Sequence, residues 1–319
     1  MDSLDRRSFV RGSLCLGAAG MPLSFLASCK SEEPVPGPTG GGAARASTGE
    51  LFTISLAQWS LHLELQSGEL DPMDFPATTK SMGIDAVEYV NSFYGNRVDE
   101  PGFGAELKQR CDDAGVQSLL IMCDGLGHLG DSGEFERKRA VENHRPWLDL
   151  AQQLGCHSIR VNARSSGSRD EQLDRAADGL HQLCEVADGH GLNVLVENHG
   201  GLSSDGSWLS DVMRRVDHPR VGTLPDFGNF DLGGGQTYDR YQGVEELMPF
   251  AKAVSAKSHD FDAGGKEIHT DYHRMLKIVV DAGYRGFVGI EYEGSELPER
   301  VGIERTFDLL VRVRAELSA

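Results

Sequence analysis

The chain has 319 residues, of which 39% are hydrophobic and 25% charged, and its formal net charge is −18. This is the composition of an ordinary globular protein, and it excludes extensive disorder outside the N-terminus. The negative charge argues against nucleic acids and anionic lipid surfaces as binding partners, because both repel an acidic protein and no run of Lys and Arg offsets the charge.

The first fifty residues differ in composition from the rest and predict export. Arg6-Arg7-Ser8-Phe9-Val10-Arg11 precedes an apolar stretch of small residues, from Gly12 to Ala27, that is too short to span a bilayer in the mature protein. Residues 1–28 therefore resemble a twin-arginine signal peptide. Leu26-Ala27-Ser28-Cys29 resembles the lipobox of bacterial lipoproteins, which predicts lipidation at Cys29 and a periplasmic or cell-envelope location with a membrane anchor. The alternative is a chance cysteine after an uncleaved anchor.

Residues 29–50 are expected to form a disordered tether. Pro34, Pro36, Pro38 and Gly40-Gly41-Gly42 leave no periodic apolar face with which this segment could join a core. Residues 51–319 then form a single domain, close to the roughly 250 residues of one (β/α)8 barrel. Its four cysteines show no CxxC spacing, and because twin-arginine export carries proteins folded in a reducing cytoplasm, we expect buried free thiols. They are Cys111, Cys123, Cys156 and Cys184.

From Leu51 onward, short runs rich in β-branched residues alternate with longer amphipathic stretches, a rhythm typical of βα units with a parallel sheet. Eight such runs can be counted, the number that closes a barrel. The predicted strands are Phe52 to Gln58, Ala86 to Val90, Gln117 to Cys123, Ser158 to Asn162, Asn193 to Glu197, Val221 to Asp226, Ala253 to His259 and Phe287 to Glu291.

Three helices between these strands have clear ends, each at a glycine that turns the chain toward the next strand. They run from Pro146 to Leu154, from Asp170 to His190 and from Asp271 to Ala282. A doubly wound open sheet is the alternative fold, but no Gly-rich phosphate-binding loop follows the first strand. The sequence therefore predicts an α/β protein with a single (β/α)8 TIM barrel.

Carboxylates stand at the C-terminal ends of three of the last four strands. Glu197 follows Val194-Leu195-Val196, Asp226 ends the sixth strand, and Glu291 follows Val288-Gly289-Ile290. In a TIM barrel these ends meet at one mouth, which carries the active site. Carboxylates are costly to bury there unless they are paired or bind a metal ion. We therefore predict that Glu197, Asp226 and Glu291 converge on a divalent cation.

The chain resembles the xylose isomerase-like TIM-barrel family of sugar isomerases and epimerases. The resemblance rests on Val-Glu-Asn-His at 196–199, Asp-Phe-Gly-Asn at 226–229 and Gly-Ile-Glu-Tyr at 289–292. It implies one divalent metal ion, Mn²⁺, Mg²⁺, Co²⁺ or Zn²⁺, bound by a Glu, an Asp, a His and a Glu from successive strands. Matched residue by residue, it gives Glu197, Asp226 and Glu291 as metal ligands.

The histidine ligand is where the chain departs from this pattern. Many relatives carry it two positions before a Lys on the seventh strand, and here Ser255 stands at that position, before Lys257. Alternation along a strand places Ser255, Lys257 and His259 on one face, so His259 is predicted as the fourth ligand. The alternatives are a rim histidine, or a site of three carboxylates and water with Lys257 beside it.

Five further residues are candidate substrate contacts: His199, Lys257, Asn162, Glu88 and Trp59. Glu88 and Asn162 end the second and fourth strands, where the resemblance implies polar groups that contact substrate. His199 lies two residues after Glu197, and a structural hydrogen bond is the alternative role for it. Trp59, like Tyr89 and Phe227, is a candidate wall for a sugar ring, with core packing as the alternative.

The function implied is that of a sugar isomerase or epimerase, with Glu197 and Glu291 as the catalytic pair that removes and returns a proton next to a carbonyl. One alternative is a lyase or hydratase acting on keto-sugars or 3-keto-glycosides. Another is a non-catalytic sugar-binding lipoprotein, and a DNA-repair endonuclease is disfavoured by the acidity and the few strand-end histidines. The expected partner is a small carbohydrate; a homo-oligomer stays open.

Overall fold

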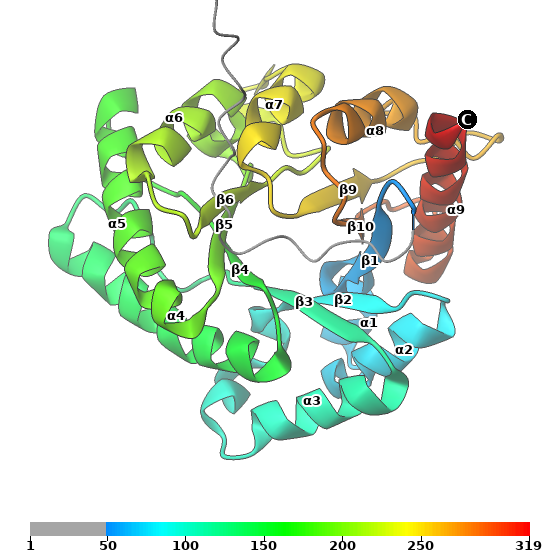
Figure 1. The fold of residues 1–319 in the computed structure, drawn as a ribbon, viewed down its shortest axis with the longest axis horizontal. Helices are drawn as coiled ribbons and strands as arrows, with labels where there is room; N and C mark the ends of the chain where they lie inside the picture. Colours follow the sequence, from blue (N-terminus) through cyan, green and yellow to red (C-terminus); the bar gives the residue numbers. More distant parts are fainter. Residues whose placement is uncertain (1–48) are drawn as a thin grey trace, which may run out of the picture. The chain divides into compact units, whose positions relative to one another are not determined.

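Eight parallel strands form the centre of the structure, a computed structural model that describes residues 49–319 (Figure 1). They are hydrogen-bonded in the order β6-β5-β4-β3-β2-β1-β10-β9. Their bounds are β1 Thr53–Ala57, β2 Ala86–Val90, β3 Gln117–Met122, β4 Ser158–Val161, β5 Asn193–Glu197, β6 Val221–Leu224, β9 Val254–Ser258 and β10 Phe287–Tyr292. The predicted signal peptide, Cys29 and the tether up to residue 48 lie outside the described residues.

The two end strands of this sheet meet and close it. Isolated parallel bridges pair Thr223 with Ala251 and Asp226 with Ser255. The N–H of Phe227 donates to the carbonyl oxygen of Ser255 at 3.1 Å, and the N–H of Ser255 donates to the carbonyl oxygen of Pro225 at 2.9 Å. The fold is therefore the predicted TIM barrel, with β6 joined to β9 just beyond the end of β6.

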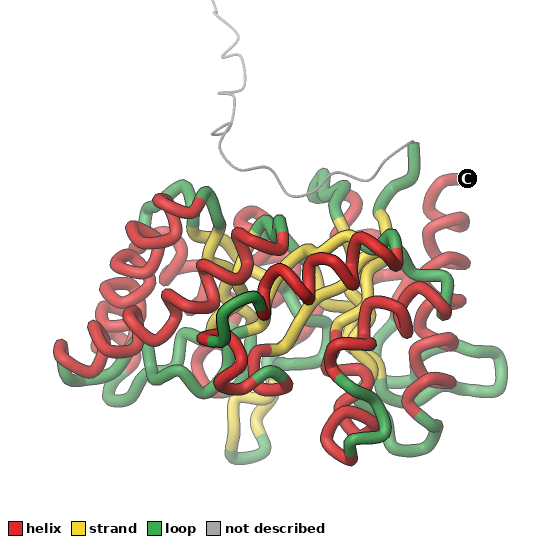
Figure 2. The backbone as a smooth tube through the Cα atoms, turned by 90° about the horizontal axis from the view of Figure 1, so that it is seen from below, coloured by secondary structure: helices red, strands yellow, loops and turns green. Residues whose placement is uncertain are grey.

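Helices follow the strands and surround them on the outside, as Figure 2 shows. A short antiparallel hairpin, β7 Asp231–Gly233 and β8 Gln236–Thr237, is inserted after β6. The helices are α1 His62–Ser67, α2 Phe75–Ser81, α3 Phe103–Ala114, α4 Glu134–Leu154, α5 Arg169–His190, α6 Gly206–Val216, α7 Arg240–Leu247, α8 Tyr272–Asp281 and α9 Glu299–Ser318. Within residues 49–319, no helix combines the length and apolar character needed to cross a membrane.

Local sequence explains where helix α5 begins and ends. The Ser168 side chain accepts from the N–H of Glu171, whose side chain accepts from the N–H of Ser168, which is a capping box. At the other end Gly191 adopts a φ of 73°, the left-handed conformation that a glycine takes at no steric cost. Helix α4, in contrast, begins twelve residues before the predicted start at Pro146, at Glu134.

Alternating strand residues divide the core into two parts. Val194 and Val196 of β5 belong to the large cluster between strands and helices, whereas Leu195 belongs to a small inner cluster with Leu120 and Met122 of β3. Glu197 shares the inward face of Leu195, because residues two apart on a strand point the same way. The four cysteines of the domain are buried and free, as predicted.

Candidate active site

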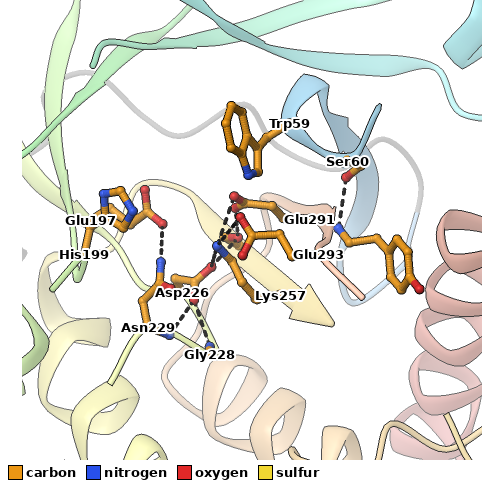
Figure 3. Close-up of polar contacts among 12 residues, drawn as sticks. Trp59, Ser60, Glu197, His199, Asp226, Gly228, Asn229, Lys257, Glu291 and Glu293 are labelled. Atoms are coloured by element: carbon orange, nitrogen blue, oxygen red, sulfur yellow. Dashed lines mark hydrogen bonds and ion pairs between the residues drawn. The ribbon is translucent and has the colours of Figure 1, made fainter. Parts of the chain in front are cut away.

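Three carboxylates meet at the C-terminal ends of the barrel strands. Glu197 is the last residue of β5, Asp226 lies two residues beyond β6, and Glu291 is the second-to-last residue of β10. Each offers an oxygen, and these oxygens all lie within 4.8 Å of one another (Figure 3). All three side chains are buried, with at most 3% of their surface exposed. The structure confirms that Glu197, Asp226 and Glu291, the acidic triad, converge at one place.

Two buried cations face the triad. Lys257 Nζ lies 3.1 Å from Glu291 Oε1, 3.8 Å from Asp226 Oδ2 and 3.4 Å from Glu293 Oε1. On the opposite side, Arg160 Nε lies 2.8 Å from Glu197 Oε2. That pair lacks the alignment of a hydrogen bond, so the contact is purely ionic. The three buried carboxylates of the triad and the two buried cations are thus held together in a space shielded from water, where charges interact strongly, and Glu293 lies at its edge.

Arg160 was not predicted as a site residue. It lies in the middle of β4, with its Nη1 2.8 Å from Asp124 Oδ1, and both residues line the cavity described below. The sequence could have indicated it, because Arg160 stands inside the predicted buried strand Ser-Ile-Arg-Val. A charged side chain in a buried strand needs a partner of opposite charge. Asp124, which follows β3, gave no comparable signal.

Hydrogen bonds fix the orientation of the triad. Asp226 Oδ1 accepts from the N–H groups of Gly228 and Asn229, both at 2.8 Å, so the Asp-Phe-Gly-Asn motif folds around its own carboxylate. The Asn229 amide then donates to Glu197 Oε1 at 2.9 Å. Gly228 is required sterically, because a Cβ there would lie 2.9 Å from Cγ of Lys257.

Ser255 lies between two members of the triad. Its Oγ is 2.8 Å from Asp226 Oδ2 and 2.8 Å from Glu291 Oε2, and only 1% of the residue is exposed. A hydroxyl carries one proton, so it can donate to one of these oxygens at a time. The contact places Ser255 in the same cluster as the three carboxylates.

Burial and the two cations change the acidity of the triad in different directions. Burial raises the pKa of Glu197 to about 8, although Arg160 opposes the shift. Burial likewise raises the pKa of Asp226 to about 6, against Lys257. For Glu291 the effect of burial is outweighed by Lys257 and Arg160, so its pKa lies below the usual value. The cluster has four carboxylates, those of the triad and of Glu293, against two cations, and a further cation would balance this charge.

A cavity of about 780 Å³ opens onto this cluster. Four residues of the cluster line it: Glu291, Glu293, Arg160 and Asn229. Glu197 does not line the cavity itself but contacts Arg160 and Asn229. The predicted contacts Trp59, Asn162 and His199 also line it, whereas Lys257 does not and lies buried beside Glu291 and Glu293. This volume falls within the roughly 300–1,000 Å³ typical of small-molecule sites.

The polar and aromatic residues of the cavity wall hold one another in place. His199 lines the cavity, and its Nδ1 lies 2.9 Å from Asn162 Oδ1, so the structural hydrogen bond that was its alternative role is observed, while its contact with substrate stays a prediction. Trp59 stacks on His62 with ring centroids 5.0 Å apart and exposes part of its ring. Tyr89 and Phe227, in contrast, are buried in the core.

Glu88 does not line the cavity, contrary to its predicted role in substrate binding. It lies deeper in the barrel, where Ser55 Oγ donates to its Oε1 at 2.6 Å and burial raises its pKa to about 7. A Cβ on Gly289 would lie 2.6 Å from this carboxylate, so Gly289, two residues before Glu291, makes room for it. Glu88 was predicted at the C-terminal end of the second strand, but it is the middle residue of β2 and therefore lies below the strand ends.

His259 is the second residue that lies away from its predicted place. It is not among the residues whose ligand atoms meet at the triad. Strand β9 ends at Ser258, so the alternation that puts Ser255 and Lys257 on one face does not continue to His259. Its ring instead packs edge to face on His269, with centroids 6.0 Å apart.

The triad fits the ligand requirements of one divalent cation. Carboxylate oxygens within 4.8 Å of one another can approach a single ion, and Glu197 Oε2 accepts no hydrogen bond among the described residues. The triad lies at the C-terminal strand ends of a TIM barrel, beside a cavity of ligand size. Enzymes of this fold carry their active sites at this place.

Comparison with known proteins names the family. The chain belongs to the xylose isomerase-like TIM barrel family, whose model matches residues 76–313. No curated protein sequence matches the chain.

Solved structures share the fold at low sequence identity. A sugar phosphate isomerase/epimerase from Parabacteroides distasonis is 16% identical, with a TM-score of 0.65 over 85% of this chain and 97% of its own. The 3-keto-D-glucoside 4-epimerase of E. coli is 18% identical, with a TM-score of 0.59 over 77% and 94%. A probable 3-DHS dehydratase from Bacillus anthracis is 17% identical, with a TM-score of 0.60 over 82% and 99%.

Proposed function

We propose that the chain is a divalent-metal-dependent sugar isomerase or epimerase that moves a proton to and from the carbon next to a carbonyl group. The observation that carries this proposal is the buried triad of Glu197, Asp226 and Glu291 beside the 780 Å³ cavity. Membership of the xylose isomerase-like family supports it, and structures of similar fold include sugar epimerases.

The two glutamates are the proposed acid and base. They come from β5 and β10, which are separated around the barrel by β6 and β9, so the two carboxylates reach the site from different strands. One carboxylate removes the proton from carbon, the electron pair moves onto the carbonyl oxygen to give an enediolate, and the other carboxylic acid returns a proton. Glu197, Asp226 and Glu291 would hold a divalent cation, which would supply charge stabilisation for the enediolate oxygen.

The neighbouring residues have supporting roles in this proposal. The ammonium of Lys257 lies beside Glu291 and Glu293, which line the cavity, and in this proposal its charge stabilises the enediolate from behind that wall. Trp59 lines the cavity and offers a partly exposed ring for sugar stacking. The His199–Asn162 pair also lines the cavity and offers polar contacts.

A lyase is the second candidate. The same proton removal followed by loss of a substituent from the next carbon gives elimination, and the same residues serve it. A cavity of about 780 Å³ accommodates more than one sugar ring, so a glycoside fits this candidate as well as the first. A probable dehydratase is among the structures of similar fold.

A screen of ketoses and 3-keto-glycosides with Mn²⁺ present tests the proposal. We expect an epimer or isomer as the product, and a loss of rate of about 10²–10⁴-fold in Glu197→Gln and in Glu291→Gln. Glu304→Gln, an exposed position on α9, is the control and should keep full activity. An unsaturated product identifies the lyase, and bound metal with no turnover identifies a sugar-binding protein.

A further inference from the structure

The donor atoms that meet in the site are all oxygens. Within residues 49–319, the cluster of potential ligand atoms comprises three carboxylates and contains no histidine and no cysteine. Two imidazoles predicted at the barrel mouth have other partners: His199 Nδ1 lies 2.9 Å from Asn162 Oδ1, and His259 packs edge to face on His269. A nitrogen ligand is thus missing from the side of the site that β9 provides.

Ser255 occupies that side. Strand β9 lies between β6 and β10 in the closed barrel, and Ser255 pairs with Asp226 across one junction and with Gly289 across the other. Its Oγ is 2.8 Å from one oxygen of Asp226 and 2.8 Å from one oxygen of Glu291. An ion held by these two carboxylates would therefore also lie within reach of the hydroxyl.

Lys257 cannot take this place. It is the other inward-pointing residue of β9 at this level, but an ammonium group only donates hydrogen bonds and offers no lone pair to a metal ion. The serine hydroxyl is thus the one neutral donor that β9 directs at Asp226 and Glu291 among the described residues.

We propose that Ser255 takes the place of a nitrogen ligand, so that this site is built from oxygen atoms alone and favours hard cations, Mg²⁺ or Mn²⁺, over Zn²⁺ and Co²⁺. The inference rests on the metal dependence of the proposed function and specifies its ligands. Carboxylate and hydroxyl oxygens suit Mg²⁺ and Mn²⁺, whereas imidazole and thiolate shift selectivity toward Zn²⁺ and Co²⁺.

Calorimetric titration of the purified, EDTA-stripped full-length chain with Mn²⁺, Mg²⁺ and Zn²⁺ tests the inference. Ser255→Cys changes one atom from oxygen to sulfur at nearly constant size. It should raise the affinity for Zn²⁺ relative to Mn²⁺ by on the order of tenfold or more, because a thiolate is a soft ligand. Ser255→Ala should weaken Mn²⁺ and Mg²⁺ binding several-fold. His259→Ala is the matched control and should leave all three dissociation constants unchanged.

The outcomes separate this inference from the proposed function. An unchanged Zn²⁺ to Mn²⁺ ratio in Ser255→Cys, together with unchanged binding in Ser255→Ala, overturns the role of Ser255 while leaving the metal site intact. Weaker binding in His259→Ala overturns it in favour of a nitrogen ligand. Absence of binding of any of the three ions to the wild type overturns the metal dependence itself. Melting temperatures of the stripped variants show whether each one is folded.

Discussion

Lys257 is a buried cation whose partners are all carboxylates, and this makes its removal informative. Lys257→Met leaves Asp226 and Glu291 without their ammonium, which typically costs about 3–5 kcal/mol of stability for a broken buried ion pair. We expect a lower melting temperature without metal and a large recovery with Mn²⁺, since an ion that binds only the folded state stabilises it. Catalysis should fall while metal binding persists.

Lys266→Met, at an exposed loop position, is the control for this experiment. It should change neither the melting temperature nor its response to Mn²⁺. If Lys257→Met lost metal binding instead of keeping it, the ammonium would be holding the carboxylates in their ligand positions, and its proposed role toward the substrate would be wrong.

His157 provides a prediction about pH that does not involve the metal site. Burial and the nearby Lys252 lower its pKa from 6.5 to about 4. When the pKa of a histidine is lower in the folded than in the unfolded state, the folded protein is more stable at a pH above the unfolded pKa than at a lower pH. This stabilisation is lost as the pH falls from 6.5 toward 4, because only the unfolded chain takes up the proton.

Urea unfolding at pH 7 and pH 4.5 measures this effect. The wild type should lose about 2–3 kcal/mol more stability between these pH values than His157→Gln, whose side chain does not titrate. Parallel losses in the two proteins would show that His157 is accessible to protons in the folded state.

At the scale of single elements, helix α5 contains a matched pair of glycines. A Cβ on Gly179 would lie 1.9 Å from the carbonyl oxygen of Leu129, whereas a Cβ on Gly189 would meet nothing within 4 Å. Gly179→Ala must push the helix away from the segment after β3 and should cost about 1–3 kcal/mol, the range of overpacking. Gly189→Ala should stabilise the protein by up to about 1 kcal/mol through helix propensity.

Denaturant unfolding of the two variants decides between packing and propensity. Equal and stabilising effects at both positions would mean that α5 does not pack against Leu129 as described. Gly179 shows why a glycine within a helix pattern can mark a close approach between elements rather than a weak point in the helix.

The strand ends were predictable because two simple patterns coincide there. Apolar runs bounded by glycines located β5 and β10, and the carboxylates that end these runs identified the mouth of the barrel. Where a strand or helix ends was less predictable. Alternation suggested that β9 extends to His259, but the strand stops at Ser258.

Helix α4 was predicted too short for a physical reason. Pro146 suggested a first turn, since proline is most common there. The helix nevertheless passes through Pro146, and its buried face continues on both sides of it, with Val141 and His144 before and Trp147 and Leu148 after. Packing of that face compensates for the roughly 3 kcal/mol that proline costs inside a helix.

Contacts between distant segments could not be read from the sequence at all. The layer that Glu88 occupies depends on Ser55 and on the missing side chain of Gly289, and these lie 33 residues before it and 201 residues after it. The ion pair of Arg160 with Glu197 joins adjacent strands whose spacing along the chain carries no signature. Such contacts are set by the closed barrel as a whole.

At the scale of the whole molecule, the buried apolar residues among those that the structure describes run from Phe52 to Val313. We therefore expect residues 49–319 to fold and act without the preceding segment. We also propose that the segment directs export and that Cys29 carries a lipid. The full chain should then fractionate with membranes, and Cys29→Ser should be released from them while keeping wild-type activity. A wild type found entirely in the soluble fraction would refute the anchor.

Solvent deuterium exchange tests the central claim most directly. The protein is incubated in D₂O with Mn²⁺ and a substrate from the ketose and 3-keto-glycoside screen, and deuterium is located by NMR. We expect incorporation at the carbon next to the carbonyl, with a rate about 10²–10⁴-fold lower in Glu197→Gln and Glu291→Gln. Exchange at wild-type rate in both variants, or a metal-loaded wild type that exchanges no proton of any substrate, would contradict the account.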